Sequence, residues 1–146
     1  MRIHRSIEIA APAGKIWPFL VEPEKILRWC SPATKVERTG DQNGGAGTSF
    51  YFEERAIGRL MKLHFVVTEW VVNERLAFKM TTGNFVNEYE QRYTIETIDS
   101  GSRCTCFEDV KLPYGTLGQI ALLFRRRSSE GLLKAMLGRL KMLAEA

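Results

Sequence analysis

The chain has 146 residues, of which 45% are hydrophobic and 26% charged, the composition of a folded globular protein rather than a disordered one. No apolar run approaches the roughly 18 residues needed to cross a membrane, and the N-terminal residues lack the apolar core of a secretory signal. We therefore expect one domain, residues 1–146, located in the cytoplasm.

The surplus positive charge lies in the last quarter of the chain. Residues 1–114 contain 15 basic and 15 acidic side chains, whereas residues 115–146 contain six basic and two acidic ones. On a helix, the consecutive Arg125, Arg126 and Arg127 point in three directions about 100° apart and cannot follow a phosphate backbone. We expect no nucleic-acid partner. Contact of this basic segment with a membrane surface or an acidic partner stays open.

Cysteine and histidine offer no metal site in this sequence. Cys104 and Cys106 are two residues apart and would share one side of a strand, where they cannot easily form a disulfide, so these and Cys30 are predicted to be reduced core thiols. His4 and His64 fall in separate elements without ligand spacing. No phosphate-binding loop precedes a helix. We expect neither a metal nor a cofactor.

The first three predicted elements are one strand and two short helices. Residues 2–10 alternate polar and apolar side chains, the period of a half-exposed strand. A short helix follows Pro12 and is limited by Pro18, and a second begins at Pro23.

Six further strands are predicted, joined by short turns. They span residues 35–39, 48–54, 59–72, 76–81, 85–98 and 103–111. Neighbouring strands joined by short turns must be antiparallel, because parallel pairs need long crossovers.

Residues 114–146 contain no proline and predict one long amphipathic helix, with Thr116 and Gln119 at the spacing of a capping box. One side of this helix carries Leu117, Ile120, Ala121, Phe124, Ser128, Gly131, Leu132, Ala135, Gly138 and Met142, and we expect it to face the sheet. The predicted fold is therefore α+β, with a curved seven-stranded antiparallel sheet wrapped around a long C-terminal helix and two short helices between strands 1 and 2.

Several stretches of the sequence resemble a known superfamily. They are residues 7–20 with the following Trp29, residues 45–50, residues 67–78, residues 98–104 and the terminal helix. Together they are similar to the SRPBCC superfamily, the START-like or helix-grip fold of pollen-allergen-type proteins, and within it to the polyketide cyclase/dehydrase-like group. The resemblance covers the whole chain, and it implies a deep cavity between the sheet and the C-terminal helix that holds a small hydrophobic molecule.

Large aromatic side chains on the sheet and small residues on the helix agree with such a cavity. The expected ligand-binding residues are Trp29, Phe50, Phe52, Phe78, Phe85, Tyr89, Gln91, Tyr93, Phe124, Ser128, Gly131 and Ala135. The alternative is that the aromatic rings fill the space themselves.

Two carboxylates are candidates for chemistry in that cavity. By strand alternation, Glu54 shares a side with Phe50 and Phe52, and Glu108 shares a side with Cys104 and Cys106. A carboxyl group facing aromatic walls has a raised pKa and can act as a general acid or base. The alternative is that both lie at an exposed rim.

Three functions follow from this reading. The first is binding of a small hydrophobic molecule, such as a lipid, polyketide, aromatic or quinone-like compound. The second is a polyketide cyclase or dehydratase activity that uses Glu54 and Glu108, and the third is a co-chaperone-like or membrane-surface interaction module. The sequence leaves open whether the protein is a monomer or a homodimer.

Overall fold

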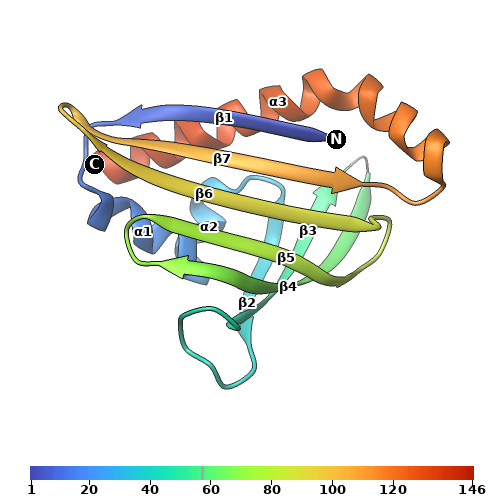
Figure 1. The fold of residues 1–146 in the computed structure, drawn as a ribbon, viewed down its shortest axis with the longest axis horizontal. Coiled ribbons are helices and arrows are strands. Elements are labelled where there is room, and N and C mark those ends of the chain that lie inside the picture. The colour runs from blue at the N-terminus through green and yellow to red at the C-terminus, as the bar shows by residue number, and fades with distance from the viewer. Residues whose placement is uncertain (57) are drawn as a thin grey trace.

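The computed structural model describes residues 1–56 and 58–146, with the backbone alone at Leu122. The elements in chain order are β1 (Arg2–Ile9), α1 (Ala13–Val21), α2 (Pro23–Trp29), β2 (Ala33–Thr39), β3 (Ser49–Ala56), β4 (Arg59–Val71), β5 (Arg75–Gly83), β6 (Glu88–Ile98), β7 (Gly101–Lys111) and α3 (Gly115–Glu145) (Figure 1). The predicted order of one strand, two short helices, six strands and one long helix is confirmed.

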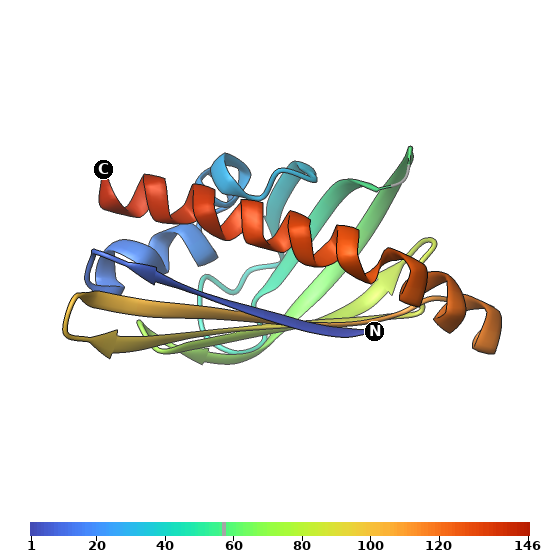
Figure 2. The same cartoon turned by 90° about the horizontal axis from the view of Figure 1, so that it is seen from above.

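All seven strands form one antiparallel sheet in the order β1-β7-β6-β5-β4-β3-β2. Figure 2 shows the three helices on the same side of this sheet, with β2, β3 and β4 bending up around α3. The predicted helix-grip fold is therefore confirmed. No helix in the described residues has an apolar stretch long enough to cross a membrane.

The core lies between the inner side of the sheet and the C-terminal half of α3. Aromatic rings dominate the sheet side: Phe50 is fully buried and contacts Phe78 edge-on at a ring separation of 5.6 Å. The indole of Trp29 donates a hydrogen bond of 2.7 Å to the carbonyl oxygen of Phe19, and its ring meets Tyr93 edge-on. These contacts fix α2 against the sheet.

The expected inner side of α3 is wrong. The buried hydrophobic residues of this helix, among those described, are Leu133, Met136, Leu137, Leu140 and Ala144. They lie roughly 160° around the helix from the predicted side, which is exposed at Phe124, Gly131, Ala135 and Met142. The reason is that α3 carries apolar residues on more than one side, so its periodicity does not select the side that packs.

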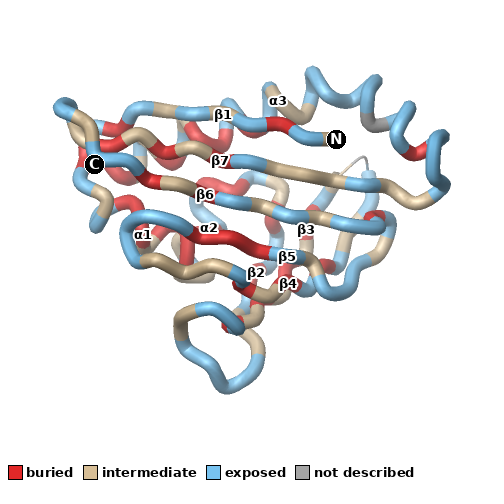
Figure 3. Tube along the Cα trace, in the orientation of Figure 1, coloured by how far each residue is buried: buried red, intermediate tan, exposed pale blue. Residues whose placement is uncertain are grey.

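The first turns of α3 extend beyond the end of the sheet (Figures 1 and 2). Figure 3 shows this part of the helix as largely exposed, in contrast to its buried C-terminal half. The helix begins after Tyr114, whose backbone is left-handed with a φ of 76° and which supplies no side-chain cap. The predicted capping box of Thr116 and Gln119 is therefore wrong.

Two sequence predictions about β6 and the cysteines have different outcomes. β6 begins at Glu88 rather than at residue 85. Phe85 instead lies in the preceding loop with a φ of 63°, and the Arg59 guanidinium lies 4.7 Å from the centre of its ring. Cys30, Cys104 and Cys106 are free and buried, as predicted.

The corrected orientation of α3 can be tested by the stability of two variants of this helix, one of which is a control. Leu140 is fully buried, so we expect Leu140→Ala to lower the free energy of unfolding by about 2–5 kcal/mol in urea titrations. Met142 is 71% exposed on the same helix, so Met142→Ala should change it by less than about 0.5 kcal/mol. Equal losses in both variants would contradict this orientation of α3.

Candidate binding pocket

A pocket of about 360 Å³ lies between the inner side of the sheet and α3. Strands β3, β4, β6 and β7, the loop before β6, and the middle of α3 all contribute to its wall. Its apolar lining residues are Met1, Pro32, Ala56, Met61, Val86, Val110, Leu112, Leu132 and Met136. This mostly aliphatic lining is suited to an apolar ligand.

Two carboxyl groups line this pocket from different strands. Glu54 comes from β3 and is only 8% exposed, because it follows Phe52 on the inner side of the strand. Glu108 comes from β7 and is half-buried. Strand alternation predicted both side chains to point inward, and the structure brings them into the same pocket.

The Glu108 carboxylate belongs to a hydrogen-bonded network on β6. Gln91 is its register partner on that strand, and the Gln91 amide donates to a Glu108 oxygen at 3.0 Å and to the Tyr89 hydroxyl oxygen at 2.9 Å. The Tyr93 hydroxyl donates a longer bond of 3.5 Å back to the Gln91 carbonyl. This network holds the Gln91 amide in one orientation and fixes the position of Glu108.

Glu54 has no such support. Among the described residues, no side chain or backbone group donates a hydrogen bond to its carboxyl group, and no basic side chain forms an ion pair with it. Its oxygens are not fully enclosed, however. Among the described residues, the one fully buried side-chain polar atom without a partner is Nε of Arg38, so the Glu54 oxygens still reach the pocket. Glu54 therefore presents an unpartnered acceptor to whatever occupies the pocket.

Burial raises the pKa of the Glu54 carboxyl group to about 7, and the nearby charge of Glu108 adds to the effect. Burial also raises the pKa of Glu108, although hydrogen bonds from Gln91 and Tyr89 oppose this rise. Burial places the pKa of the Tyr89 and Tyr93 hydroxyls well above their usual value. Near neutral pH the pocket therefore holds one carboxyl group that is close to half protonated beside a second whose charge Gln91 stabilises.

Basic side chains border the pocket on its outer side. Arg55 follows Glu54 on β3, and Arg125 lies in the exposed part of α3. Ser128, one turn further along α3, is also exposed and lines the same border. The pocket is thus acidic inside and basic at its rim.

The structure divides the twelve expected ligand-binding residues into three groups. Tyr89, Gln91 and Ser128 line the pocket. Packed into the core, with no more than 8% of their surface exposed, are Trp29, Phe50, Phe52, Phe78 and Tyr93. Exposed and away from the pocket are Phe85, Phe124, Gly131 and Ala135. The aromatic rings of the sheet therefore fill most of the space predicted for a ligand.

Sequence reasoning missed several lining residues for identifiable reasons. Met136 and Ser129 were missed because the wrong side of α3 was predicted to face the sheet. Val86 was missed because it was predicted to lie in a strand that in fact begins at Glu88. Cys30 follows Trp29 at the end of α2 and lines the pocket, although the sequence suggested only a core thiol. The length of Met61 and its place opposite Glu54 across β3 and β4 would have been a usable signal.

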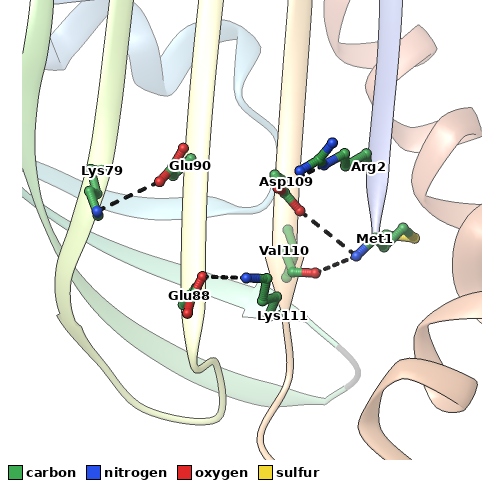
Figure 4. Close-up of polar contacts among 8 residues, drawn as sticks. All are labelled: Met1, Arg2, Lys79, Glu88, Glu90, Asp109, Val110 and Lys111. Atoms are coloured by element: carbon green, nitrogen blue, oxygen red, sulfur yellow. Dashed lines mark hydrogen bonds and ion pairs between the residues drawn. The ribbon is translucent and has the colours of Figure 1, made fainter. Parts of the chain in front are cut away.

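A second hollow, of about 570 Å³, lies on the outer side of the sheet. Figure 4 shows the ion pairs at its border: Arg2 with Asp109 at 3.1 Å, and Lys79 with Glu90 at 3.8 Å. These charges already have partners on exposed strands, so the hollow offers little to a ligand. We therefore take the inner pocket as the candidate site.

Figure 4 also shows how the start of β1 is tied to the end of β7. The main-chain nitrogen of Met1 donates to the carbonyl oxygen of Val110 at 2.6 Å, and the Met1 side chain extends toward α3. Lys111 and Glu88 form an ion pair of 2.9 Å across β7 and β6. These contacts hold the end of the sheet that carries Met1 and Val110 in the pocket wall.

Comparison with known proteins agrees with this architecture. A family model described as polyketide cyclase/dehydrase and lipid transport matches residues 1–145. A search of curated proteins gives no significant match.

Solved structures with the same fold include three bacterial proteins. A START superfamily protein from Mycobacterium smegmatis is 19% identical with a TM-score of 0.79, covering 97% of this chain and 98% of that one. A protein from Thermus thermophilus is 17% identical with a TM-score of 0.79, covering 99% and 95%. The Zhui aromatase/cyclase from a Streptomyces species is 16% identical with a TM-score of 0.75, covering 97% and 93%. At these identities the likeness establishes the fold alone.

The raised pKa of Glu54 predicts a pH-dependent stability difference. A carboxyl group whose pKa is 4.5 when unfolded and about 7 when folded favours the folded state less and less as the pH rises through that interval. We expect the advantage of Glu54→Gln over the parent protein, measured by urea unfolding, to grow by about 2–3 kcal/mol from pH 5 to pH 8.

The matched control is Glu74→Gln in the exposed turn between β4 and β5, which should show no such growth. A pH-independent difference between the parent and Glu54→Gln would mean that Glu54 is solvated in the folded protein.

Proposed function

The chain belongs to the polyketide cyclase/dehydrase and lipid transport family, and from that premise we propose that it binds a small hydrophobic molecule in the pocket between the sheet and α3. The observation that carries this proposal is the pocket itself: about 360 Å³, walled mainly by aliphatic side chains and containing a few fixed polar groups. Burial of an apolar ligand would supply most of the affinity, and Gln91, Glu108 and Glu54 would orient it.

The size of the pocket limits the ligand. It is at the small end of the range for drug-sized molecules, because the rings of Phe50, Phe52 and Phe78 occupy the remaining space under the sheet. We therefore favour a compact aromatic, a short-chain lipid or a small polyketide over a long-chain lipid. The pocket opens beside the exposed half of α3, which gives a ligand a route of entry that does not disturb the core.

The cyclase or dehydratase alternative rests on Glu54. A buried carboxyl group with a pKa of about 7 is suited to exchange protons near neutral pH. A catalytic role for Glu54 and Glu108 stays a prediction, and full turnover of an identified substrate by Glu54→Gln would rule Glu54 out as the acid or base.

A second candidate function, contact with an anionic membrane surface, is favoured by the exposed half of α3. Three large apolar side chains stand out from it: Tyr114 is 83% exposed, Leu117 is 74% exposed and Phe124 is 86% exposed. Arg125, Arg126 and Arg127 follow directly, and the first acidic residue of the helix, Glu130, already bonds to Arg126 at 3.1 Å. Apolar and basic side chains together are typical of helices that lie on anionic lipid surfaces.

The position of this segment connects the two candidate functions. Arg125 and Ser128 line the pocket from the same helix. The end of β3, the start of β4 and the loop joining β5 to β6 lie at this end of the molecule as well (Figures 1 and 2). A membrane bound there would face the opening of the pocket, so an apolar ligand could pass between them without crossing water.

Ligand binding is tested by filling the pocket. Ser129 lines it from α3, so Ser129→Phe should weaken binding of the uncharged fluorophore N-phenyl-1-naphthylamine about tenfold or more, by occupying the space. Ala135→Phe introduces the same ring on the exposed side of α3 and should leave the affinity unchanged. Equal affinity of both variants for the fluorophore would place the binding site elsewhere.

Membrane contact is tested by co-sedimentation with vesicles of phosphatidylcholine, with and without phosphatidylglycerol. We expect binding only to the anionic vesicles, and loss of most of it in Phe124→Ser and in the Arg125→Glu/Arg127→Glu double variant. Met142→Ser removes an exposed apolar side chain from the far end of α3 and serves as the control.

Three results would contradict the membrane proposal: binding to neutral vesicles, binding unaffected by these substitutions, or a dimer in solution that Phe124→Ser disrupts. The last result would identify a second copy of the chain as the occupant of this surface.

A further inference from the structure

The two carboxyl groups of the pocket differ in the hydrogen bonds they accept, and this difference bears on what the pocket binds. Glu108 receives a hydrogen bond from Gln91 at 3.0 Å, whereas Glu54 receives none from the described residues. Glu54 is nonetheless only 8% exposed and lines the pocket. Its oxygens are not fully enclosed and reach the pocket, so the missing hydrogen bond is left to water or to a ligand there.

Among the described residues, no other polar group of the pocket donates to Glu54, and the nearby Tyr89 hydroxyl bonds to Glu108 instead. The Gln91 amide donates to both Tyr89 and Glu108, which uses both of its N–H groups. Arg55 lies next to Glu54 on β3, but adjacent residues of a strand point to opposite sides of the sheet, and Arg55 is exposed. Cys30 also lines the pocket, but a thiol is only a weak donor.

From this geometry, and resting on the proposed function, we infer that the ligand is an apolar molecule whose buried end carries a hydrogen-bond donor for Glu54 and Glu108, a hydroxyl or an ammonium group. Such a donor completes the bonding of Glu54, and Glu108 lines the same pocket from β7 as a second acceptor. The apolar remainder of the molecule then contacts Met61, Val86, Leu132 and Met136.

The same arrangement excludes other ligand classes. A carboxylate or phosphate at the buried end would face two carboxyl groups, which repel it. Above the pKa of Glu54, a purely apolar molecule, or one with acceptors alone, would displace water from the ionised carboxylate without replacing its hydrogen bond. An anionic group is tolerated only at the rim, beside Arg125.

Four naphthalene derivatives that share one ring system separate these classes. 2-Naphthol carries a hydroxyl donor, 2-methoxynaphthalene an acceptor alone, 2-(aminomethyl)naphthalene an ammonium group and 2-naphthoate a carboxylate. Their affinities for the full chain can be measured by isothermal titration calorimetry at pH 8, above the pKa of about 7 of Glu54, where this group is an ionised acceptor. We expect 2-naphthol and the ammonium compound to bind at least about tenfold more tightly than 2-methoxynaphthalene, and 2-naphthoate to bind most weakly.

Two variants of Glu54 identify the group that makes this selection. Glu54→Leu removes the acceptor and should abolish the preference for 2-naphthol while 2-methoxynaphthalene still binds. Glu54→Gln keeps a carbonyl acceptor but no charge, so it should retain the preference for 2-naphthol and lose that for the ammonium compound. Comparison of these two probes in Glu54→Gln therefore distinguishes a neutral hydroxyl ligand from a cationic one.

The outcomes separate this inference from the function on which it rests. If 2-methoxynaphthalene binds as tightly as 2-naphthol to the parent protein, the inference is overturned and the binding pocket stands. A preference that survives in Glu54→Leu also overturns it. If none of the four probes binds to the folded parent protein, both the inference and the proposed function fail. The parent comparison holds even if a variant does not fold.

Discussion

Two carboxyl groups in one apolar pocket, with no ion pair to a basic side chain among the described residues, are the constraint on which the rest of the site depends. Like charges at close range in a poorly hydrated space cannot both be ionised at low cost, so one of them must bind a proton or find a donor. Gln91 stabilises the charge on Glu108. Below about pH 7 the proton therefore resides on Glu54, and at higher pH Glu54 is a charged acceptor without a donor.

The fold explains how one pocket can contain both carboxyl groups. Glu54 and Glu108 lie on strands that are far apart in the sheet order, and they meet because the sheet bends around α3. The core on the other side of the pocket is unusually aromatic: Phe50, Phe52, Phe65 and Phe78 contact one another at ring separations of 5.5 to 6.4 Å. This aromatic packing stabilises the folded protein and offsets the cost of the buried carboxyl groups. It also confines the pocket to one end of the sheet.

How much could be predicted from the sequence depended on the kind of pattern. Strand alternation has a period of two and a single choice of side, so it placed Glu54 beside Phe52 and Glu108 beside Cys106 correctly on the inner side of the sheet. Helix α3 offered no comparable choice, because its own apolar residues occupy more than one of its sides and its first turns extend beyond the sheet. The sequence pattern that gathered Phe124, Gly131 and Ala135 is real, but those residues are exposed.

The ligand-binding residues were harder still to predict, since whether an inward ring lines a cavity or fills it depends on the curvature of the sheet and the rotation of α3. Tyr89 lines the pocket, whereas Tyr93 on the same side of β6 lies in the core, where the ring of Trp29 meets it edge-on.

The pocket has opposite electrostatic character at its two ends, and this polarity gives it a direction. Glu54 and Glu108 lie inside, whereas Arg55 and Arg125 lie at the rim beside the apolar, exposed half of α3. A molecule with a donor at one end and an apolar or anionic remainder is therefore favoured in one orientation and disfavoured in the reverse one, by interactions at both ends. Direction of this kind matters for any chemistry or transfer that follows, because it determines which end of the bound molecule meets the carboxyl groups and which end faces the opening.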